Sequence, residues 1–494
     1  MLLSNLPALQ VVIPLVSAPL CLLLRNPRHA WAWSTLVSWL VLATAIVLAQ
    51  RVYAGGTISY AIGAWATPWG VEYRIDMAGA LMVLIIATIG AIVMPYARHS
   101  IQHELHKKHT GLFYTCYLLC LTGLLGVVVT GDTFNLFVFL EISSLSSYVL
   151  ISLGSSRRAL TAAYQYLVMG TIGATFILIG IGLLYMMTGT LNMLDISQRL
   201  PEVADTRTIR VAFAFVTVGV SIKLALFPLH IWLPNAYTFA PSVISAFMAA
   251  TATKVGIYVL LRFFFTVFGI RFSFAAMHVG EILMLLAVAA ILVASLVAIF
   301  QDNVKRMLAY SSVAQIGYII LGISLATTDG VAAGMIHLFN HALIKCALFL
   351  AMGCIFLRLG SVEIGDMHGL ARQMPWTMAA FVAGGLSLIG LPLTAGFISK
   401  WYLVSAVLMD GYRPLAVIIL VSSLLALIYI WRVVEAAYFH VPGAAMHKVR
   451  EAPASMLIPV WLLIGANLYV GINATLISGM AQQGADILIG QALR

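Results

Sequence analysis

Seven ionisable side chains lie in the middle of long apolar runs of this 494-residue sequence. They comprise one carboxylate, two histidines and four lysines: Glu141, His337, His341, Lys223, Lys254, Lys345 and Lys400. A charge at the centre of a membrane helix costs roughly 2.5–3.5 kcal/mol on insertion scales, so such residues typically mark ion pathways and proton relays. Removing an ammonium group from water favours the neutral amine, which lets a buried lysine release and take up a proton. The set therefore predicts a line along which a positive charge moves between helices.

Glu141 is predicted to lie about 15 Å into a helix that begins near Asp132, at a rise of 1.5 Å per residue. That depth is the bilayer midplane, where a carboxylate must be paired or neutral. One interpretation is a gate: Glu141 near Lys223 holds a proton on the lysine, and movement of Glu141 releases this proton toward Lys254. The alternative is a structural salt bridge that locks two helices together.

His337, His341 and Lys345 are spaced four residues apart and therefore share one stripe of a helix. Histidine titrates near neutral pH, so the stripe predicts a proton relay. Two alternatives stay open. The histidines could hold a metal ion, although no third ligand lies nearby in sequence, or they could simply bond to backbone carbonyls.

Two of the apolar runs are interrupted, around Pro228 and Pro392. Proline removes a backbone donor and clashes with the preceding turn, and such breaks at membrane depth are tolerated only inside protein or beside water. Lys400 follows the second break and is expected at the exit of the line, unless its stem reaches toward the interface from a helix end. His230 follows the first break, where it either bridges the line or caps the unwound turn.

Further polar residues surround Glu141 in the sequence. Asp132 is expected at the outer mouth of this helix, or else as the cap of its N-terminus. The serines that follow Glu141 either line a wet path or permit close helix packing; they are Ser143, Ser144, Ser146 and Ser147.

The composition excludes a soluble protein, because 62% of the residues are hydrophobic, only 9% are charged and the mean hydropathy is +1.02. The net charge of +10 comes from basic residues dispersed through short loops, as membrane orientation requires, so we do not expect nucleic acid as a partner. The sequence lacks a phosphate-binding loop, a dinucleotide fingerprint and an iron–sulfur cysteine array. We therefore expect no cofactor and no bound metal, and we expect the five cysteines to serve as packing residues.

The continuous apolar runs predict an all-α polytopic membrane protein with about fourteen spans. The predicted limits are 7–24, 30–50, 75–97, 111–130, 132–152, 159–187, 209–229, 241–265, 279–300, 307–325, 329–358, 376–406, 413–439 and 454–478. The longest polar loop is expected at 192–210. An even number of spans places both chain ends on one side, and the loops of the other side are rich in arginine and lysine, which predicts that this other side is cytoplasmic. These basic residues are Arg25, Arg28, Arg98, Lys107, Lys108, Arg157, Arg158, Lys305, Arg306, Arg372, Lys448 and Arg450.

The motifs around these residues resemble the antiporter-like family shared by Mrp-type cation/proton antiporters, respiratory complex I and membrane-bound hydrogenases. The resemblance is clearest over residues 75–440. It rests on the segment that leads to Glu141 and on the segments 223–237 (KLALFPLHIWLPNAY), 240–249 (APSVISAFMA), 254–258 (KVGIY), 337–345 (HLFNHALIK) and 391–400 (LPLTAGFISK).

This resemblance implies fourteen helices with two inverted five-helix repeats and two broken helices. Residues 1–110 would hold helices 1–3, residues 111–265 the first repeat (helices 4–8), residues 277–440 the second repeat (helices 9–13) and residues 441–494 the last helix. It also implies that Glu141 pairs with Lys223, and that protons pass through Lys254 and the 337–345 stripe toward Lys400.

Within the family, the segment 130–139 (TGDTFNLFVF) is most similar to the D subunit of the Mrp antiporters. Lysine at position 400 argues against one complex I paralogue, which carries glutamate there. The serine-rich run 141–148 leaves a hydrogenase-linked relative open.

The expected function is that of a proton-translocating subunit in a multi-subunit sodium/proton antiporter of a bacterial inner membrane. Its partners would be other membrane subunits, protons, sodium ions and the lipid bilayer, and the chain would be a secondary transporter rather than an enzyme. The first alternative is a proton-pumping subunit of a complex I-like NADH-quinone oxidoreductase or a membrane-bound hydrogenase. The second is a membrane scaffold whose charges form inert salt bridges.

Overall fold

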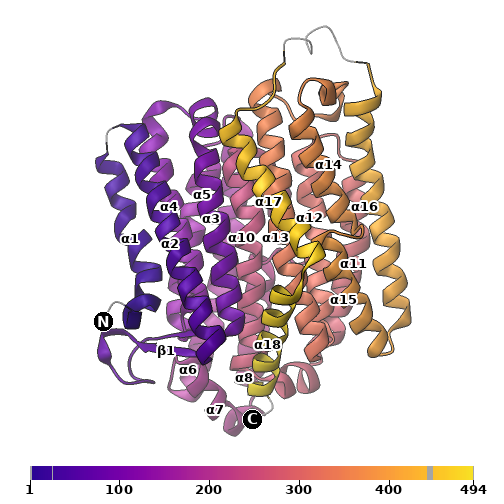
Figure 1. Ribbon diagram of the computed structural model, residues 1–494. Helices are drawn as coiled ribbons and strands as arrows, with labels where there is room; N and C mark the ends of the chain where they lie inside the picture. Colours follow the sequence, from indigo (N-terminus) through magenta and orange to yellow (C-terminus); the bar gives the residue numbers. More distant parts are fainter. Residues whose placement is uncertain (1–2, 25, 442–448, 493–494) are drawn as a thin grey trace.

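The computed structural model describes residues 3–24, 26–441 and 449–492 and shows a bundle of long helices (Figure 1). Arg25 and Lys448, two of the basic residues used to predict the orientation, lie outside the described residues. The N-terminal part contains α1 (Leu6–Leu23), α2 (Pro27–Gly55), β1 (Ile58–Ala61), β2 (Glu72–Ile75) and α3 (Met77–Glu104).

The middle of the chain forms α4 (Thr110–Val129), α5 (Thr133–Ser152), α6 (Arg157–Thr188), α7 (Met193–Val203), α8 (Arg207–Lys223), α9 (Trp232–Phe239) and α10 (Ser242–Leu261). Two π-helical turns follow, at Arg262–Val267 and Arg271–Ala276. The remaining helices are α11 (Val279–Ile299), α12 (Val304–Ser324), α13 (Thr328–Leu359), α14 (Pro375–Ile389), α15 (Ala395–Met409), α16 (Arg413–Phe439), α17 (Ala454–Ile472) and α18 (Thr475–Ala492).

The described residues contain a helix or a broken helix for each of the fourteen predicted spans. Twelve helices are long and apolar enough to cross a membrane. The other two spans are the broken ones, α8 with α9 and α14 with α15, which are interrupted where the prolines predict. The chain is therefore a multi-pass membrane protein with an all-α bundle, as the sequence predicts.

The two described chain ends lie on the same side of the bundle, at the bottom of Figure 1. The chain enters the first broken helix from this side, because α8 begins near the ends of the chain. It enters the second from the opposite side, where α14 begins. Opposite directions through the two breaks are what inverted repeats require. The repeats and their boundaries remain a prediction.

Three details differ from the sequence-based expectations. The polar segment 192–210 is not a loop throughout, because it contains α7, whose buried residues Met193, Ile196 and Leu200 follow a helical spacing. A short antiparallel hairpin, β1 with β2, connects α2 to α3. The last span does not end at residue 478, because α18 continues from α17 to Ala492 and the two helices pack along α3 and α13.

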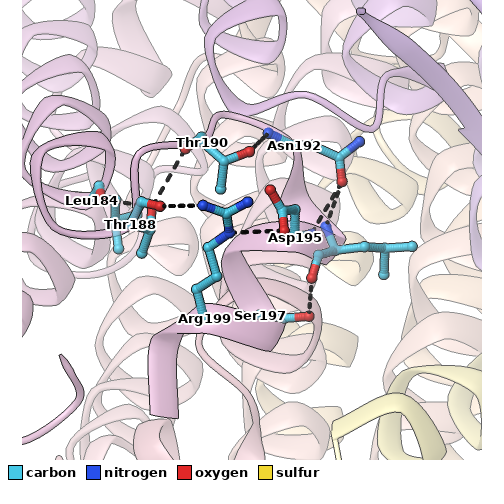
Figure 2. A network of polar contacts seen from close by, with 8 residues as sticks. Leu184, Thr188, Thr190, Asn192, Asp195, Ser197 and Arg199 are labelled. Atoms are coloured by element: carbon cyan, nitrogen blue, oxygen red, sulfur yellow. Dashed lines mark hydrogen bonds and ion pairs between the residues drawn. The ribbon is translucent and has the colours of Figure 1, made fainter. Parts of the chain in front are cut away.

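Figure 2 shows why α7 is stable outside the bundle core. The side chain of Asn192 accepts hydrogen bonds from the backbone amides of Leu194 and Asp195 and caps the helix. Arg199 donates to Asp195 Oδ1 at 2.9 Å and to the carbonyl oxygen of Thr188 at 3.1 Å. The end of α6 is thereby attached to α7.

A buried ion pair ties the start of α3 to the end of α10. The guanidinium of Arg262 donates through two nitrogens to the carboxylate of Asp76, and its Nε donates to the hydroxyl of Tyr258 at 2.8 Å. Asp76 also caps α3 by accepting from the amide of Gly79 at 2.9 Å. Every group of the pair is satisfied, which a buried ion pair requires in order not to destabilise the fold.

Candidate functional site

Glu141 and Lys223 meet at the first break. Glu141 lies in the middle of α5 and Lys223 is the last residue of α8. The ammonium of Lys223 contacts Glu141 Oε1 at 3.1 Å and donates to Ser144 Oγ at 2.8 Å. The side chain of Lys223 is 6% exposed and that of Glu141 is 23% exposed, so the carboxylate is the more accessible partner.

The break itself is held by local hydrogen bonds. Pro228 interrupts the helical ladder between Lys223 and α9, and Ala225 takes a positive φ of 59°. The indole of Trp232, in the first turn of α9, donates to the carbonyl oxygen of Ile222 at 3.0 Å. The same carbonyl also accepts from the backbone amide of Ala225 at 3.2 Å, so the indole adds a second donor and joins α9 to the end of α8.

Lys254 lies deep in α10 and is completely buried. Its ammonium donates to the carbonyl oxygen of Ala249. The helix α13, which carries His337, His341 and Lys345, packs along α10. In the described residues no hydrogen bond or ion pair joins Lys254 to Lys223, although the neighbouring Gly256 lies directly against Leu224 at the break.

The predicted stripe on α13 is fully buried, and its three members have different surroundings. The two ring nitrogens of His337 lie 2.9 Å from Ser399 Oγ and from Gln315 Oε1. His341 stacks on His337 with ring centroids 6.2 Å apart, and neither of its ring nitrogens has a hydrogen-bond partner in the described protein.

Lys345 ends this stripe. Its ammonium donates to the carbonyl oxygen of Leu308 at 2.9 Å and to Ser311 Oγ at 2.8 Å, both on α12. The alternative of histidines bonded to backbone carbonyls does not describe His337, because its partners are side chains. An unpartnered, buried imidazole at His341 can accept or pass a proton in a way that a saturated one cannot.

Lys400 occupies the second break. Its ammonium donates to the carbonyl oxygens of Leu388 and Ile389 at the end of α14, at 3.2 and 2.8 Å, and to Ser423 Oγ of α16 at 2.8 Å. It also lies 5.1 Å from the centre of the Tyr318 ring. The lysine is 7% exposed, so it does not extend toward an interface. The Tyr318 ring also lies 5.5 Å from the ring of His337, and His337 contacts Ser399, the residue before Lys400, so the line continues from α13 to the break.

Gly396 allows α15 to approach α14 closely enough for this arrangement. A Cβ atom at position 396 would lie 1.8 Å from the backbone oxygen of Ser387. We expect Gly396→Ala to force the two helices apart and to destabilise the protein by roughly 1–3 kcal/mol, with a matching loss of assembled complex. Thermal unfolding and the yield of assembled complex in detergent measure this effect.

Gly465 of α17 is the matched control, because a Cβ atom there meets no atom within 4 Å. Gly465→Ala should leave both the unfolding temperature and the yield at the level of the wild type or slightly above it. Equal stability of the two variants would contradict the close contact at Gly396.

The two secondary candidates lie apart from the line. Asp132 caps α5 by accepting from the amide of Asn135 at 2.7 Å. His230 stacks on Phe227 with centroids 5.1 Å apart and faces the ring of Tyr310 on α12. Within the described residues, neither forms a hydrogen bond or an ion pair with one of the seven predicted residues.

The uncharged partners of the line were not predicted from the sequence. They are the groups that hold the lysines and His337 in place: Gln315, Ser311, Ser399, Ser423 and the carbonyls at the end of α14. A serine or glutamine inside an apolar span is too common to be singled out without its spatial neighbours. Ser144 is one of the four serines that follow Glu141, and it is the one that binds Lys223.

The other serines after Glu141 bond to their own helix. Ser143, Ser146 and Ser147 donate to the carbonyls of Leu140, Ile142 and Ser143. Ser147 also contacts the thiol of Cys120 on α4. These serines permit close packing of α4 against α5, and only Ser144 contacts the predicted line.

Comparisons with known proteins agree with this architecture. The family model described as NADH:quinone oxidoreductase/Mrp antiporter, transmembrane, matches residues 130–426. The N subunit of the NADH-quinone oxidoreductase of Desulforudis audaxviator is 42% identical, over 97% of this chain and 98% of its own length. The D subunit of the Na(+)/H(+) antiporter of Alkalihalophilus pseudofirmus is 30% identical, over 98% of this chain and 97% of its own length.

A solved structure shows the same fold. A chain in the structure of the Mrp complex from Dietzia sp. DQ12-45-1b superposes with a TM-score of 0.90 at 26% identity, over 99% of this chain and 98% of that one. The matched segment 130–426 includes the Glu141–Lys223 pair, both breaks and the α13 stripe. The chain thus belongs to the NADH:quinone oxidoreductase/Mrp antiporter family of membrane proteins.

Proposed function

We propose that this chain is the proton-translocating subunit of a multi-subunit sodium/proton antiporter in a bacterial inner membrane. The observation that carries the proposal is the buried line of titratable groups that runs from Lys254 along α13 to Lys400, with the Glu141–Lys223 pair at its other end. Such groups are costly inside a membrane and are retained where protons or ions move.

The contacts suggest how each group serves this transport. Glu141 stabilises the charged form of Lys223, and its greater exposure leaves it room to move away. When Glu141 withdraws, Lys223 keeps only the hydroxyl of Ser144 as a partner, and the ammonium then favours release of its proton. Lys254, His341 and Lys345 receive that charge in turn, and Lys400 passes it on at the second break.

Support for an antiporter comes from the relatives. Proteins named as D subunits of Na(+)/H(+) antiporters match nearly the whole chain, and the Mrp complex contains a chain of the same fold. Partner subunits would cover part of the apolar surface. In the helices α6, α11 and α16, only 39% of the residues in the most apolar stretch are buried within the chain. The remaining residues form wide faces for lipid or for other membrane subunits.

A second candidate is the proton-pumping membrane subunit of a redox-driven complex. The specific observation that favours it is the 42% identity to the N subunit of an NADH-quinone oxidoreductase, which exceeds the 30% identity to the D subunit of an antiporter. The line of titratable groups would serve equally in both complexes. The two candidates differ in the source of energy and in the partners.

Proton movement in vesicles that contain the whole complex separates the two candidates. A sodium pulse should drive proton movement in the absence of an electron donor, and vesicles with the Lys223→Ala complex should serve as the inactive reference. Proton movement that follows NADH and quinone but not sodium would replace the antiporter by the redox-driven pump. If neither sodium nor an electron donor moved protons, both proposals would be wrong.

A further inference from the structure

We propose that Glu104, Ser242 and Lys305 form a proton-loading site that connects the aqueous phase to Lys345, on the side of the bundle opposite the chain ends. This inference rests on the proposed function, because it adds an entrance to the same line. The three residues come from helix ends that are distant in sequence. Glu104 ends α3, Ser242 begins α10, and Lys305 lies in the first turn of α12.

The hydrogen bonds of this site form a relay. Glu104 Oε2 accepts from the backbone amide of Ser242 at 2.9 Å and from its hydroxyl at 3.2 Å. The ammonium of Lys305 donates to the same hydroxyl at 2.9 Å. The Ser242 hydroxyl therefore accepts from the ammonium of Lys305 and donates to the carboxylate of Glu104. A proton can move between the two residues when the hydroxyl takes up a proton from one of them and releases its own proton to the other.

Exposure gives the relay a direction. Glu104 is half-buried and reaches the surface of the bundle, whereas Lys305 is only 3% exposed and lies 5.1 Å from the centre of the Phe356 ring of α13. The carboxylate is therefore the outer group and the lysine the inner one. Among the described residues, Lys305 of α12 shares the Ser242 hydroxyl with Glu104, and Tyr96 lies about two turns before Glu104 on α3.

One face of α12 leads from this site to the central line. Lys305, Leu308 and Ser311 follow one another at intervals of three residues and share a face of the helix. Lys345 binds both the carbonyl of Leu308 and the hydroxyl of Ser311. The rise from Lys305 to Ser311 is about 9 Å, a length that the flexible stem of lysine or one or two bridging waters can span.

The same construction occurs at the Glu141–Lys223 pair. In both places a partly exposed carboxylate stands beside a buried lysine, and the lysine ammonium donates to a serine hydroxyl, Ser144 or Ser242. The difference is position. Lys223 lies at the first break, whereas Lys305 lies three and six residues, within two helical turns, from the partners of Lys345, Leu308 and Ser311. The chain thus carries one such arrangement at the first break and a second one that leads to Lys345, within the central line.

A purely structural explanation must be distinguished from this proposal. The carboxylate of Glu104 accepts from the first amide of α10 and so stabilises that helix N-terminus. The amide oxygen of glutamine can accept both bonds from Ser242, and its NH2 group can donate to Ser100 Oγ, which in the wild type donates to Glu104 Oε1 at 2.6 Å, but glutamine cannot take up a proton. Glu104→Gln therefore separates the capping role from the proton-loading role, and Glu104→Asp restores a titratable carboxylate.

The test is sodium-driven proton movement per assembled complex in vesicles that contain the whole complex. We expect Glu104→Gln to assemble normally and to slow proton movement at least about tenfold, and we expect Glu104→Asp to recover most of the rate. Glu363→Gln is the matched control, because this exposed carboxylate on the same side binds Asn303 at the start of α12 and lies outside the relay. It should behave like the wild type.

Lys305→Arg provides a second test that does not depend on the cap. Arginine keeps the positive charge and the donors toward Ser242 but does not release a proton in proteins. We expect a loss of proton movement similar to that of Glu104→Gln. A wild-type rate per complex in Lys305→Arg or in Glu104→Gln would overturn the proposal, and a failure of Glu104→Gln to assemble would leave Lys305→Arg to decide.

The Lys223→Ala complex, measured in parallel, distinguishes this inference from the proposed function. If Lys223→Ala is inactive while Glu104→Gln and Lys305→Arg keep the wild-type rate, only the proton-loading site is wrong. If Lys223→Ala also keeps the wild-type rate, the proposed transport line itself is wrong.

Discussion

Complexes that carry Glu141→Gln together with Lys223→Met will assemble in wild-type amounts and will move almost no protons. The double change removes both charges of the pair, so neither an unpaired carboxylate nor an unpaired ammonium is left inside the bundle. Replacing a buried ion pair by neutral groups of similar volume is often neutral or stabilising. Proton movement, in contrast, loses the carboxylate and the amine that would carry it, and we expect a drop of at least about 100-fold.

The single change Glu141→Gln should behave differently. It leaves the ammonium of Lys223 beside Ser144 without its counter-charge. Removing one partner of a buried pair destabilises by roughly 3–5 kcal/mol, and the 23% exposure of Glu141 reduces this figure because water screens the charge. The single variant should therefore assemble less well than the double variant.

The measurements are the amount of assembled complex in membranes and the rate of sodium-driven proton movement per complex. The Asp195–Arg199 pair of α7, drawn in Figure 2, is the control. The double change Asp195→Asn with Arg199→Gln removes a carboxylate–cation pair outside the line and should leave the rate unchanged. If the Glu141/Lys223 double variant instead kept a wild-type rate per complex, the scaffold interpretation of these charges would be correct.

Lys254→Met will abolish proton movement while the complex continues to assemble. Lys254 is completely buried in α10, the helix that packs along α13, and in the proposed line it carries the proton from the first break to the stripe. Methionine has a similar length and no charge, and it removes a buried amine that, among the described residues, donates to the backbone carbonyl of Ala249. The rate per complex should fall at least about 100-fold.

Lys254→Arg sharpens this test. If Lys254 only supplied a fixed positive charge to α13, arginine would preserve the function. If Lys254 carries a proton, arginine fails because it stays protonated. Lys107→Met, at an exposed lysine of the short turn before α4, is the control for loss of a lysine and should keep the wild-type rate. Activity in Lys254→Arg together with inactivity in Lys254→Met would show that charge, and not proton transfer, is needed at this position.

The sequence by itself determined the bundle, its breaks and most of the candidate line. A charged residue in the middle of an apolar run has no stable place except the bundle interior, so Glu141, Lys223, Lys254 and Lys345 are recognisable from their position in the span alone. Prolines in two spans predicted the breaks. Proline lacks the amide donor of the helical ladder, and this local defect does not depend on where the helix lies in the fold. The pairing of Glu141 with Lys223 was predicted both by the interpretation of Glu141 as a gate for the Lys223 proton and by the family resemblance.

Only the tertiary structure decided which groups surround each charge. The acceptors of Lys345 are 34 and 37 residues away in sequence, and Lys400 reaches back to the end of α14 for its carbonyls. The amphipathic helix α7 was missed because its cap and its contact with α6 depend on a turn that polarity alone does not reveal.

Glu104 and Lys305 show the same limit. Each lies at the end of a span, where a charge is ordinarily solvated and does not indicate a buried site; Lys305 indicated only the orientation of the chain in the membrane. They acquire significance because the fold brings the ends of α3, α10 and α12 together across separations of 138 and 63 residues. Hydropathy and helical periodicity are properties of neighbouring residues, whereas a relay is made of contacts between distant ones, and long-range packing decides those contacts.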